Sequence, residues 1–405
     1  MKRILFLIVS ALCVLPMMAE GEGEKAGGKA AEGQMEDKGS AWLSDKSADG
    51  GEDVGRKADE STDGSEDAGM KAAESADIEG ADKTDAPRKS LGRTLSAYVS
   101  VPKFGGYFIG KYAYSDQEGQ HGGEGFSQRF IRAYVDGTIL NDFKYRIQVQ
   151  VNNSTFHMKD YYVEWSHWQE LAVKVGQYKR AFLFENPYNP WDVGAGDYSQ
   201  IARHLAGIGD KDGNVANGGR DQGVQVQGDL FPSKKDGHRY VHYQLQVMNG
   251  QGINSGDANG RKDVLGTLQV QPIEGLQFGI FGWTGNYVDS EGRTLERNRW
   301  AASARYDGGG WVARAEYAHS QGHLHADGWY ATVGAPLCNW LQLYVKYDAY
   351  RPKKTWGSMK TIYSIVPNIQ IHKNLLLQVQ YNYVHDRTLS SPGYNELWGE
   401  VYVRF

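Results

Sequence analysis

Basic side chains recur at alternate positions within short segments of this sequence. Lys144 and Arg146, for example, are separated by a single tyrosine. Alternate residues of an extended segment share one face, so cations in this pattern gather along one surface. In a confined space they raise the local concentration of anions, and an arginine can hold phosphate through paired donors. Eight cations have this placement: Arg132, Lys144, Arg146, Lys174, Arg299, Arg305, Arg314 and Lys346.

Carboxylates are expected on the same faces as these cations. They support a second interpretation, in which the cations belong to an ordinary polar surface without selectivity for anions. The acidic side chains that would offset them are Asp136, Asp160, Glu164, Asp221, Glu316 and Asp348. Both interpretations stay open from the sequence, because selectivity depends on which charges a solute can reach.

Catalytic and metal chemistry find little support. Ser154 and His157 are close enough in sequence for an acyl-transfer pair, but the short polar loop expected there has no recognisable third partner. His319, His323 and His325 could bind a metal, yet no carboxylate or thiolate supports them. No phosphate-cradling glycine motif or nucleic-acid signature appears. We therefore predict no catalytic residue, no metal, no cofactor and no nucleic-acid partner.

The cations lie in segments whose apolar and polar residues alternate. From Phe143 to Val151 every odd-numbered residue is apolar or aromatic, whereas the even-numbered ones are lysine, arginine and glutamine. A strict period of two predicts a strand. An apolar face opposite a charged face suits a strand that separates lipid from a wet interior.

The same pattern predicts an all-β fold, a sixteen-stranded antiparallel transmembrane β-barrel. An even number of strands returns both ends of the barrel to one side of the membrane, as in bacterial outer-membrane barrels. The expected strands are 105–115, 126–138, 141–153, 158–168, 171–180, 220–231, 237–249, 262–272, 275–286, 297–307, 311–320, 327–336, 340–351, 359–371, 374–386 and 396–405.

The N-terminal quarter of the chain has a different character. A charged start, Met1-Lys2-Arg3, precedes an apolar run from Ile4 to Pro16 that is too short to span a bilayer as a helix. We predict a cleaved signal peptide over residues 1–19 and a low-complexity, acidic, disordered tail over residues 20–90. The barrel domain is then residues 91–405.

One connection between the expected strands, Lys179–Gly219, is much longer than the others. We expect it to fold into the interior of the barrel and to set the size limit for solutes. Its candidate basic residues are Arg180, Arg203, His204 and Lys211, which face competition from Glu185, Asp192, Asp197, Asp210 and Asp212.

The final segment places Leu397, Val401, Val403 and Phe405 on one face. It resembles the C-terminal signature of outer-membrane barrels, which end on an aromatic residue. The resemblance implies that the barrel-assembly machinery recognises this segment.

Several segments resemble the phosphate-selective porin O/P family. The motifs are Asp160–Trp165, Leu171–Gln177, Gly219–Gly228, Phe130–Gly137 and Val345–Asp348. The likeness covers roughly residues 100 to 405 and implies a trimeric, sixteen-stranded, water-filled channel. The family's phosphate sites rest on an arginine ladder and clustered lysines, and no motif here matches those positions residue by residue.

These observations predict an outer-membrane porin for passive diffusion of small hydrophilic solutes, with anions such as phosphate preferred. The expected partners are outer-membrane lipid, small anionic or polar solutes, further copies in a homotrimer and the barrel-assembly machinery. The alternatives are a general non-selective porin, an outer-membrane barrel hydrolase and a surface-binding protein that acts through its outer loops.

Overall fold

The structure is a computed structural model. It describes residues 99–119, 124–152, 155–208, 211–212, 215–216 and 218–405. The predicted signal peptide and acidic tail, and the first residues of the predicted barrel domain, lie outside this part of the chain.

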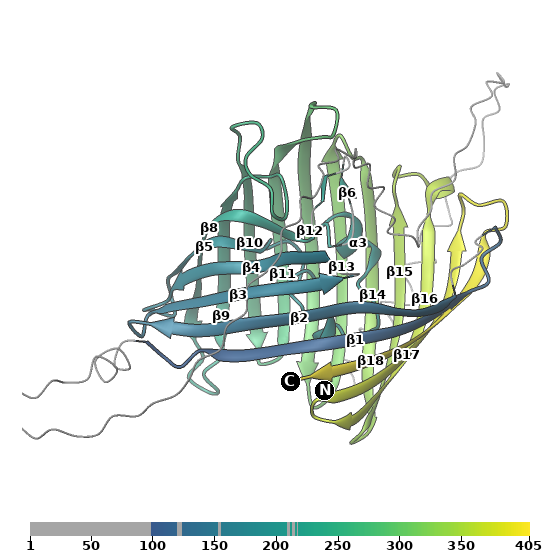
Figure 1. Ribbon diagram of the computed structural model, residues 1–405, viewed down its shortest axis with the longest axis horizontal. Coiled ribbons are helices and arrows are strands. Elements are labelled where there is room, and N and C mark those ends of the chain that lie inside the picture. The colour runs from purple at the N-terminus through teal and green to yellow at the C-terminus, as the bar shows by residue number, and fades with distance from the viewer. Residues whose placement is uncertain (1–98, 120–123, 153–154, 209–210, 213–214, 217) are drawn as a thin grey trace, which may run out of the picture. The chain divides into compact units, whose positions relative to one another are not determined.

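Sixteen antiparallel strands close into one barrel (Figure 1). The strands are β1 (Lys103–Ser115), β2 (Gly125–Ile139), β3 (Phe143–Asn152), β4 (Thr155–Trp165), β5 (Ala172–Lys179), β8 (Arg220–Pro232), β9 (Arg239–Met248), β10 (Asp263–Ile273), β11 (Leu276–Val288), β12 (Thr294–Gly308), β13 (Trp311–Gly322), β14 (Ala326–Cys338), β15 (Leu341–Arg351), β16 (Lys360–His372), β17 (Leu375–Asp386) and β18 (Gly393–Arg404). Each strand pairs with its neighbours in sequence, with β5 next to β8 and β1 next to β18. The fold predicted from the alternating pattern is confirmed.

Polar residues of the strands point inward and apolar residues point outward. On β3, Ile147 is 48 % exposed, whereas the neighbouring Gln148 is 1 % exposed. Val163, Val175 and Ile365 are among the other apolar residues exposed on the outer wall. This distribution reverses that of a water-soluble barrel and matches hydrocarbon outside and water inside.

The two ends of the barrel carry different connections. Two-residue turns at 274–275, 309–310 and 373–374 lie at one end, which we call the short-turn end. The opposite end, the long-loop end, carries the connections 180–219 and 249–262. In bacterial outer-membrane barrels the short turns lie at the periplasmic end.

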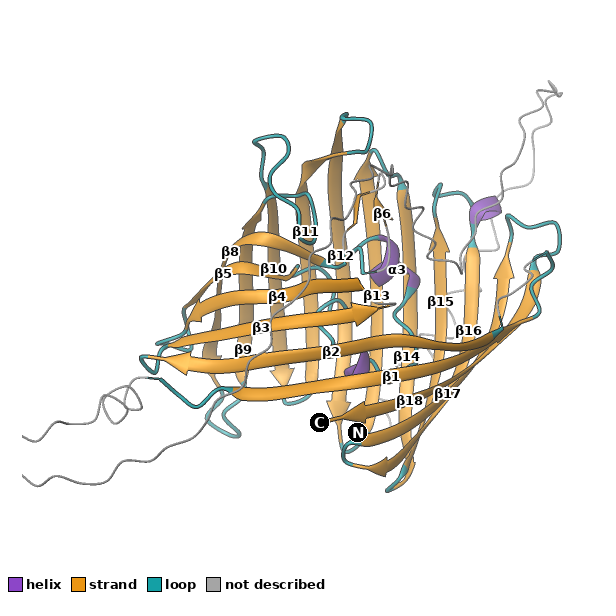
Figure 2. Ribbon diagram, in the orientation of Figure 1, coloured by secondary structure: helices purple, strands orange, loops and turns teal. Residues whose placement is uncertain are grey.

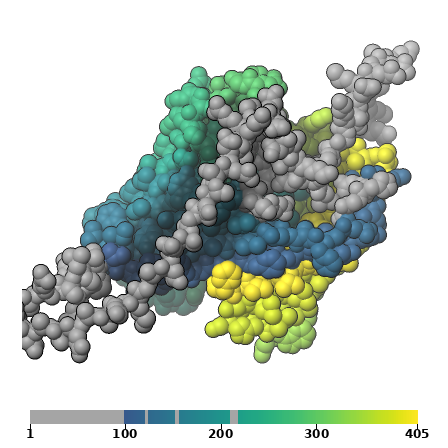
Figure 3. All heavy atoms as spheres, viewed as in Figure 1, coloured from purple at the N-terminus to yellow at the C-terminus, as the bar shows by residue number. Residues whose placement is uncertain are grey.

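The barrel closes where its first and last strands meet. Tyr107 of β1 lies opposite Arg404 of β18, and the backbone of Gly106 exchanges two hydrogen bonds with that of Phe405, at 3.0 and 3.1 Å. A side chain at Gly106 would collide with the Phe405 ring, so this close approach requires glycine. Figure 3 shows the first strands, in blue, directly against the last, in yellow.

The C-terminal residues Leu397, Val401, Val403 and Phe405 are all exposed on the outer wall. They therefore share the face that the sequence assigned to them. Their recognition by the assembly machinery stays a prediction.

The fourth strand is placed differently from the prediction. It covers Thr155–Trp165 instead of 158–168, because its register shifts between the pairs Ile147–Tyr161 and Val149–Met158. His157 consequently lies in a strand and not in the expected polar loop, and Ser154 lies outside the described residues. His319 lies near the end of β13, within the strand predicted over 311–320.

Among the described residues, no helix has the length and apolar character needed to cross a membrane.

A charge on the outer wall tests the membrane-facing surface. Ile365 lies near the middle of β16 and is exposed on that wall. Ile365→Arg should lower the free energy of unfolding by about 2–4 kcal/mol, because an arginine at mid-membrane depth is poorly solvated. Urea unfolding of the protein folded into lipid vesicles measures this loss. Ser390→Arg, in the exposed connection before β18, should change stability by less than about 0.5 kcal/mol. Equal losses in the two variants would contradict the placement of Ile365 in lipid.

Candidate functional site

The long connection between β5 and β8, Arg180–Gly219, is here called the constriction loop. Its described part lies inside the barrel, as predicted, and contains the short helices η1 (Pro190–Asp192) and α3 (Gln200–His204) and the small hairpin of β6 (Lys211–Asp212) and β7 (Val215–Ala216) (Figure 2). Loop residues such as Phe182 and Ile201 are fully buried in one cluster with wall residues such as Trp283. The loop is therefore packed against the wall.

The loop begins α3 with a standard helix cap. The Ser199 side chain accepts a hydrogen bond from the Ala202 backbone N–H, and the Ser199 backbone N–H donates to the Glu185 carboxylate at 3.0 Å. Before this helix, Gly194 and Gly196 adopt positive φ angles of 73° and 78°, which only glycine adopts without strain. The loop thus turns sharply near its tip and then enters the helix.

Carboxylates on the wall accept hydrogen bonds from the loop backbone. Glu316 of β13 accepts from the N–H groups of Phe184, at 2.7 Å, and Glu185, at 3.0 Å. Asp348 of β15 accepts from the N–H of Gln200 at 2.9 Å. These carboxylates replace the partners that a strand or helix would have given these amides.

Cations on the wall donate to loop carbonyl groups in the same way. Arg314 donates to the carbonyl of Val193 at 2.7 Å, Arg299 to that of Leu205 at 2.5 Å, and Lys346 to that of Asp197 at 2.6 Å. Arg305 donates to the Tyr188 hydroxyl at 2.8 Å. Four of the eight predicted lumen cations therefore contact the loop, and three of them bond its backbone.

The other four predicted cations do not bond the described part of the loop. Arg146 forms an ion pair with Asp136 at 2.7 Å, and Lys174 forms one with Glu164 at 2.8 Å. The two remaining positions are Arg132, which donates to Gln150 and the Tyr107 hydroxyl, and Lys144, which is exposed near the short-turn end.

The four basic residues predicted in the loop have different surroundings. Arg180 is buried with Asp221 at 3.2 Å, and Arg203 forms an ion pair with Asp197. His204 stacks on Tyr350, with ring centroids 4.5 Å apart. The backbone of Lys211 lies in β6, and its side chain is outside the described set.

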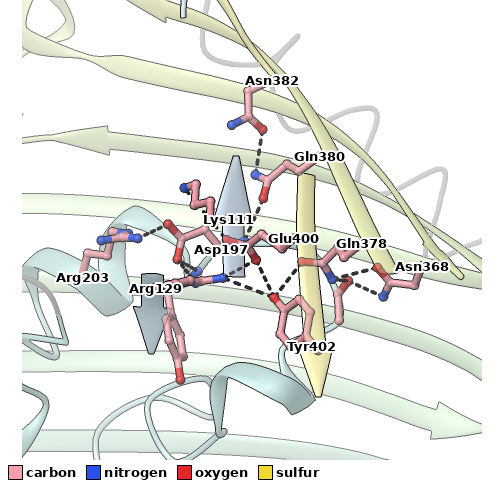
Figure 4. A network of polar contacts seen from close by, with 12 residues as sticks. Lys111, Arg129, Asp197, Arg203, Asn368, Gln378, Gln380, Asn382, Glu400 and Tyr402 are labelled. Carbon is pink, nitrogen blue, oxygen red and sulfur yellow. Dashed lines mark hydrogen bonds and ion pairs between the residues drawn. The ribbon is translucent and has the colours of Figure 1, made fainter. Parts of the chain in front are cut away.

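Sequence reasoning missed Arg129, which holds the loop tip. Arg129 donates to Asp197 of the loop and to Glu400 of β18, both at 2.6 Å (Figure 4). Arg132 of β2 faces the lumen, so strict alternation would place even-numbered residues in the lumen and odd-numbered residues on the lipid side. On this pattern Arg129 is expected to face lipid. A register shift between the pairs Ile109–Phe130 and Gly110–Gln128 reverses its direction. No single-strand pattern could have shown this bulge.

A second group that the sequence did not single out gathers basic side chains on β2, β4, β5 and β8. Arg132, Lys159, Lys179 and Arg220, here called the basic cluster, lie close enough for mutual repulsion. Asp160 pairs with Arg220 at 2.8 and 3.0 Å, and Lys179 donates to the carbonyl of Asn186. The cluster therefore has four cations around one directly paired carboxylate.

Glu185 is a loop carboxyl whose titration is altered by its surroundings. Burial raises the pKa of its side chain from 4.5 to about 7, while Lys346 and the hydrogen bonds from Ser199 act in the opposite direction and Glu316 adds to the rise. The carboxyl therefore changes its charge near neutral pH inside a closely packed segment.

The residues considered for other chemistry are dispersed. His157 and His323 are exposed. The ring centroids of His319 and His325 are 6.0 Å apart. Within the described ranges, no three histidine, cysteine or acidic side chains are grouped closely enough to hold a metal ion.

Solved structures of outer-membrane proteins resemble the barrel. An in-vitro folded OmpT of Vibrio cholerae, in a trimer form, is 10 % identical, with a TM-score of 0.54 over 75 % of this chain and 99 % of that chain. The barrel has the porin fold. An anion-selective porin from Comamonas acidovorans is 12 % identical, with a TM-score of 0.54 over 75 % and 99 % of the two chains. The outer-membrane channel DcaP of Acinetobacter baumannii is 13 % identical, with a TM-score of 0.53 over 76 % and 98 %.

At these identities the likeness shows the porin fold and not a subtype. The sequence matches no family model and no curated protein. The phosphate-selective subtype therefore stays a prediction.

Loss of one wall carboxylate should release the beginning of the constriction loop. Glu316→Gln keeps the size of the side chain, but one oxygen cannot serve Phe184, Glu185, Ser303 and Tyr330 together. We expect a local loss of about 1–3 kcal/mol and hydrogen exchange at Phe184 and Glu185 that is faster by roughly 10-fold or more. Glu164→Gln, which alters a lumen carboxylate paired with Lys174, should leave this exchange unchanged. Equal exchange in wild type and Glu316→Gln would refute the anchoring role.

Rising pH should loosen the same loop. Between about pH 4.5 and pH 7 the folded state holds a proton on Glu185 that the unfolded chain has lost, so the stability from this group is complete below pH 4.5 and falls towards pH 7. Hydrogen exchange of residues 197–201, corrected for intrinsic rates, should become faster across this range. Glu185→Gln should flatten the dependence, and the exposed Glu291→Gln should retain it. An unchanged slope in Glu185→Gln would assign the effect to another group.

Proposed function

We propose that this protein is an outer-membrane porin through which small hydrophilic solutes diffuse passively. The observation that carries the proposal is the combination of a polar lumen with a loop anchored across it. The apolar outer wall supports placement in lipid, and the predicted signal peptide and C-terminal segment support export and assembly in the outer membrane. A hydrolase receives no comparable support: His157 is exposed on β4, and Ser154, the predicted partner, lies outside the described residues.

A preference for anions is the finer part of the proposal. Arg299 and Lys346 donate to loop carbonyl groups and are buried, so they contribute little direct contact with solute. In the basic cluster Arg132 and Arg220 are buried as well, and Lys179 donates to the loop carbonyl of Asn186. The positive charge that supports the proposal is therefore that of Lys159, which is half-buried and whose side chain has no hydrogen bond or ion pair to the described residues. In a narrow polar passage such a cluster favours anions, and phosphate is a candidate because arginine offers paired donors.

A homotrimer is proposed as the assembly. The trimer form of the OmpT structure from Vibrio cholerae supports it by similarity of fold. Mass measurement in detergent and in native membrane extracts distinguishes one copy from three.

Single-channel recording tests the proposed channel directly. The full-length protein in a planar bilayer should give stable conductance steps, which a hydrolase or a fully plugged barrel would not give. Heat-modifiable migration on gels shows whether the protein is folded. Absence of conductance steps from folded protein would rule out the porin.

Charge removal at Lys159 tests the anion preference. In a KCl gradient the reversal potential should show chloride as the more permeant ion. Lys159→Gln should lower the chloride-to-potassium permeability ratio by roughly twofold, because a basic group of the cluster is lost. Lys353→Gln, in the exposed connection after β15, removes the same charge far from the cluster and should leave the ratio unchanged. Cation preference in the wild type would overturn the anion assignment. Added phosphate should shift the reversal potential only if it competes with chloride for the passage.

A further inference from the structure

A cavity of about 350 Å³ lies between the constriction loop and the wall of β9–β12, on the short-turn side of the loop. Its wall presents four glutamine side chains and two arginines, and Tyr188 of the loop also lines it. The lining residues used here are Gln244, Gln269, Gln271, Gln277, Arg305 and Tyr188. The volume falls at the lower end of the range for small-molecule sites.

Two of the four cavity amides are hydrogen-bonded to each other, with Gln277 donating to Gln271 at 2.8 Å. Gln244 donates at 3.1 Å to Gln227, which lies outside the cavity lining. Each amide can make up to four hydrogen bonds, so these contacts leave donors and acceptors for a solute. Groups that both donate and accept are the natural partners of hydroxyl groups, which do the same.

Arg305 gives the cavity a positive charge. It donates to Gln277 at 2.6 Å and to the Tyr188 hydroxyl at 2.8 Å, and its guanidinium lies 4.4 Å from the centre of the Phe184 ring. In the described part of the chain, no carboxylate lies within ion-pair distance of Arg305. With five donor hydrogens and two such contacts, the guanidinium retains donors for a ligand.

The other charges around the cavity are already paired. His242 contacts Asp229 at 2.7 Å, and Arg239 contacts Glu170 at 3.3 Å. Arg305 also lines a second cavity of about 960 Å³ towards the short-turn end, so it lies at the boundary between the two spaces. A solute that passes along this side of the loop meets Arg305 beside the glutamine amides of the first cavity and Arg314 in the second cavity.

We propose that this cavity is a binding subsite for a polyhydroxylated carboxylate, such as a sugar acid. Arg305 holds the carboxylate, the glutamine amides hold the hydroxyl groups, and the rings of Tyr188 and Phe184 flank the carbon chain. The inference rests on the proposed porin function, because it names a class of solute for that channel. It differs from the anion preference of the basic cluster, since it requires hydroxyl groups as well as charge.

Calorimetric titration of the full-length protein in detergent tests the subsite independently of conduction. Three probes are compared. Gluconate carries both hydroxyl groups and a carboxylate, glucose carries only hydroxyl groups, and acetate carries only a carboxylate. Gluconate should bind most tightly of the three. Equal affinity for gluconate and acetate, or for gluconate and glucose, would overturn the proposal.

Two variants separate the roles of charge and amides. Arg305→Gln should weaken gluconate binding by roughly 10- to 100-fold and leave glucose binding unchanged, because the charge-assisted bonds are lost. Gln269→Leu, at a position with no hydrogen bond from its side chain to the described residues, should weaken gluconate and glucose binding but not acetate binding. Arg293→Gln removes one exposed arginine charge outside the lumen and serves as the matched control. Unchanged gluconate affinity in Arg305→Gln would refute the site.

Bilayer recording then distinguishes the two levels of the proposal. Conductance steps that gluconate partly blocks in the wild type, and not in Arg305→Gln, support both the channel and the subsite. Steps without a gluconate-specific block overturn the subsite and leave the porin standing. Gluconate binding by calorimetry without steps supports the subsite and overturns the channel.

Discussion

The hydrogen bonds between charged wall side chains and the backbone of the constriction loop are the interaction on which the site depends. A loop with little regular structure brings unpaired N–H and C=O groups into the barrel, and each must find a partner. Glu316 and Asp348 accept from its amides, while Arg314 and Lys346 donate to its carbonyls. The wall thus holds the loop as a neighbouring strand would, but through side chains from several strands.

This anchoring changes how the charges of the lumen should be counted. Positive and negative anchors are nearly balanced, and buried anchors such as Lys346 give a solute little direct contact. Charges that remain accessible have the greater influence on permeation, which places weight on Lys159 and Arg305. Counting every inward-facing cation in the sequence overstates the attraction for anions, because the count includes residues whose role is to position the loop.

The alternating pattern from Phe143 to Val151 shows why the barrel was predictable and the site was not. Period two is a local property, so it fixed the strands to within a few residues. The hydrogen bond from the Phe184 N–H to Glu316 joins residues 132 apart, and no local pattern reports such a pair. Arg129 illustrates the same limit, since a bulge defined by the neighbouring strand reverses its direction.

The seam between β1 and β18 has a kinetic consequence. Asp116 and Asn395, hydrogen-bonded across it at 2.8 Å, are 279 residues apart in the chain. Closing so long a loop is entropically costly, and contacts of this sequence separation form slowly. Until they form, both seam strands expose unpaired backbone groups that invite pairing with other chains. The rate of seam closure, more than the stability of the finished barrel, therefore sets how long a newly made chain is vulnerable to aggregation.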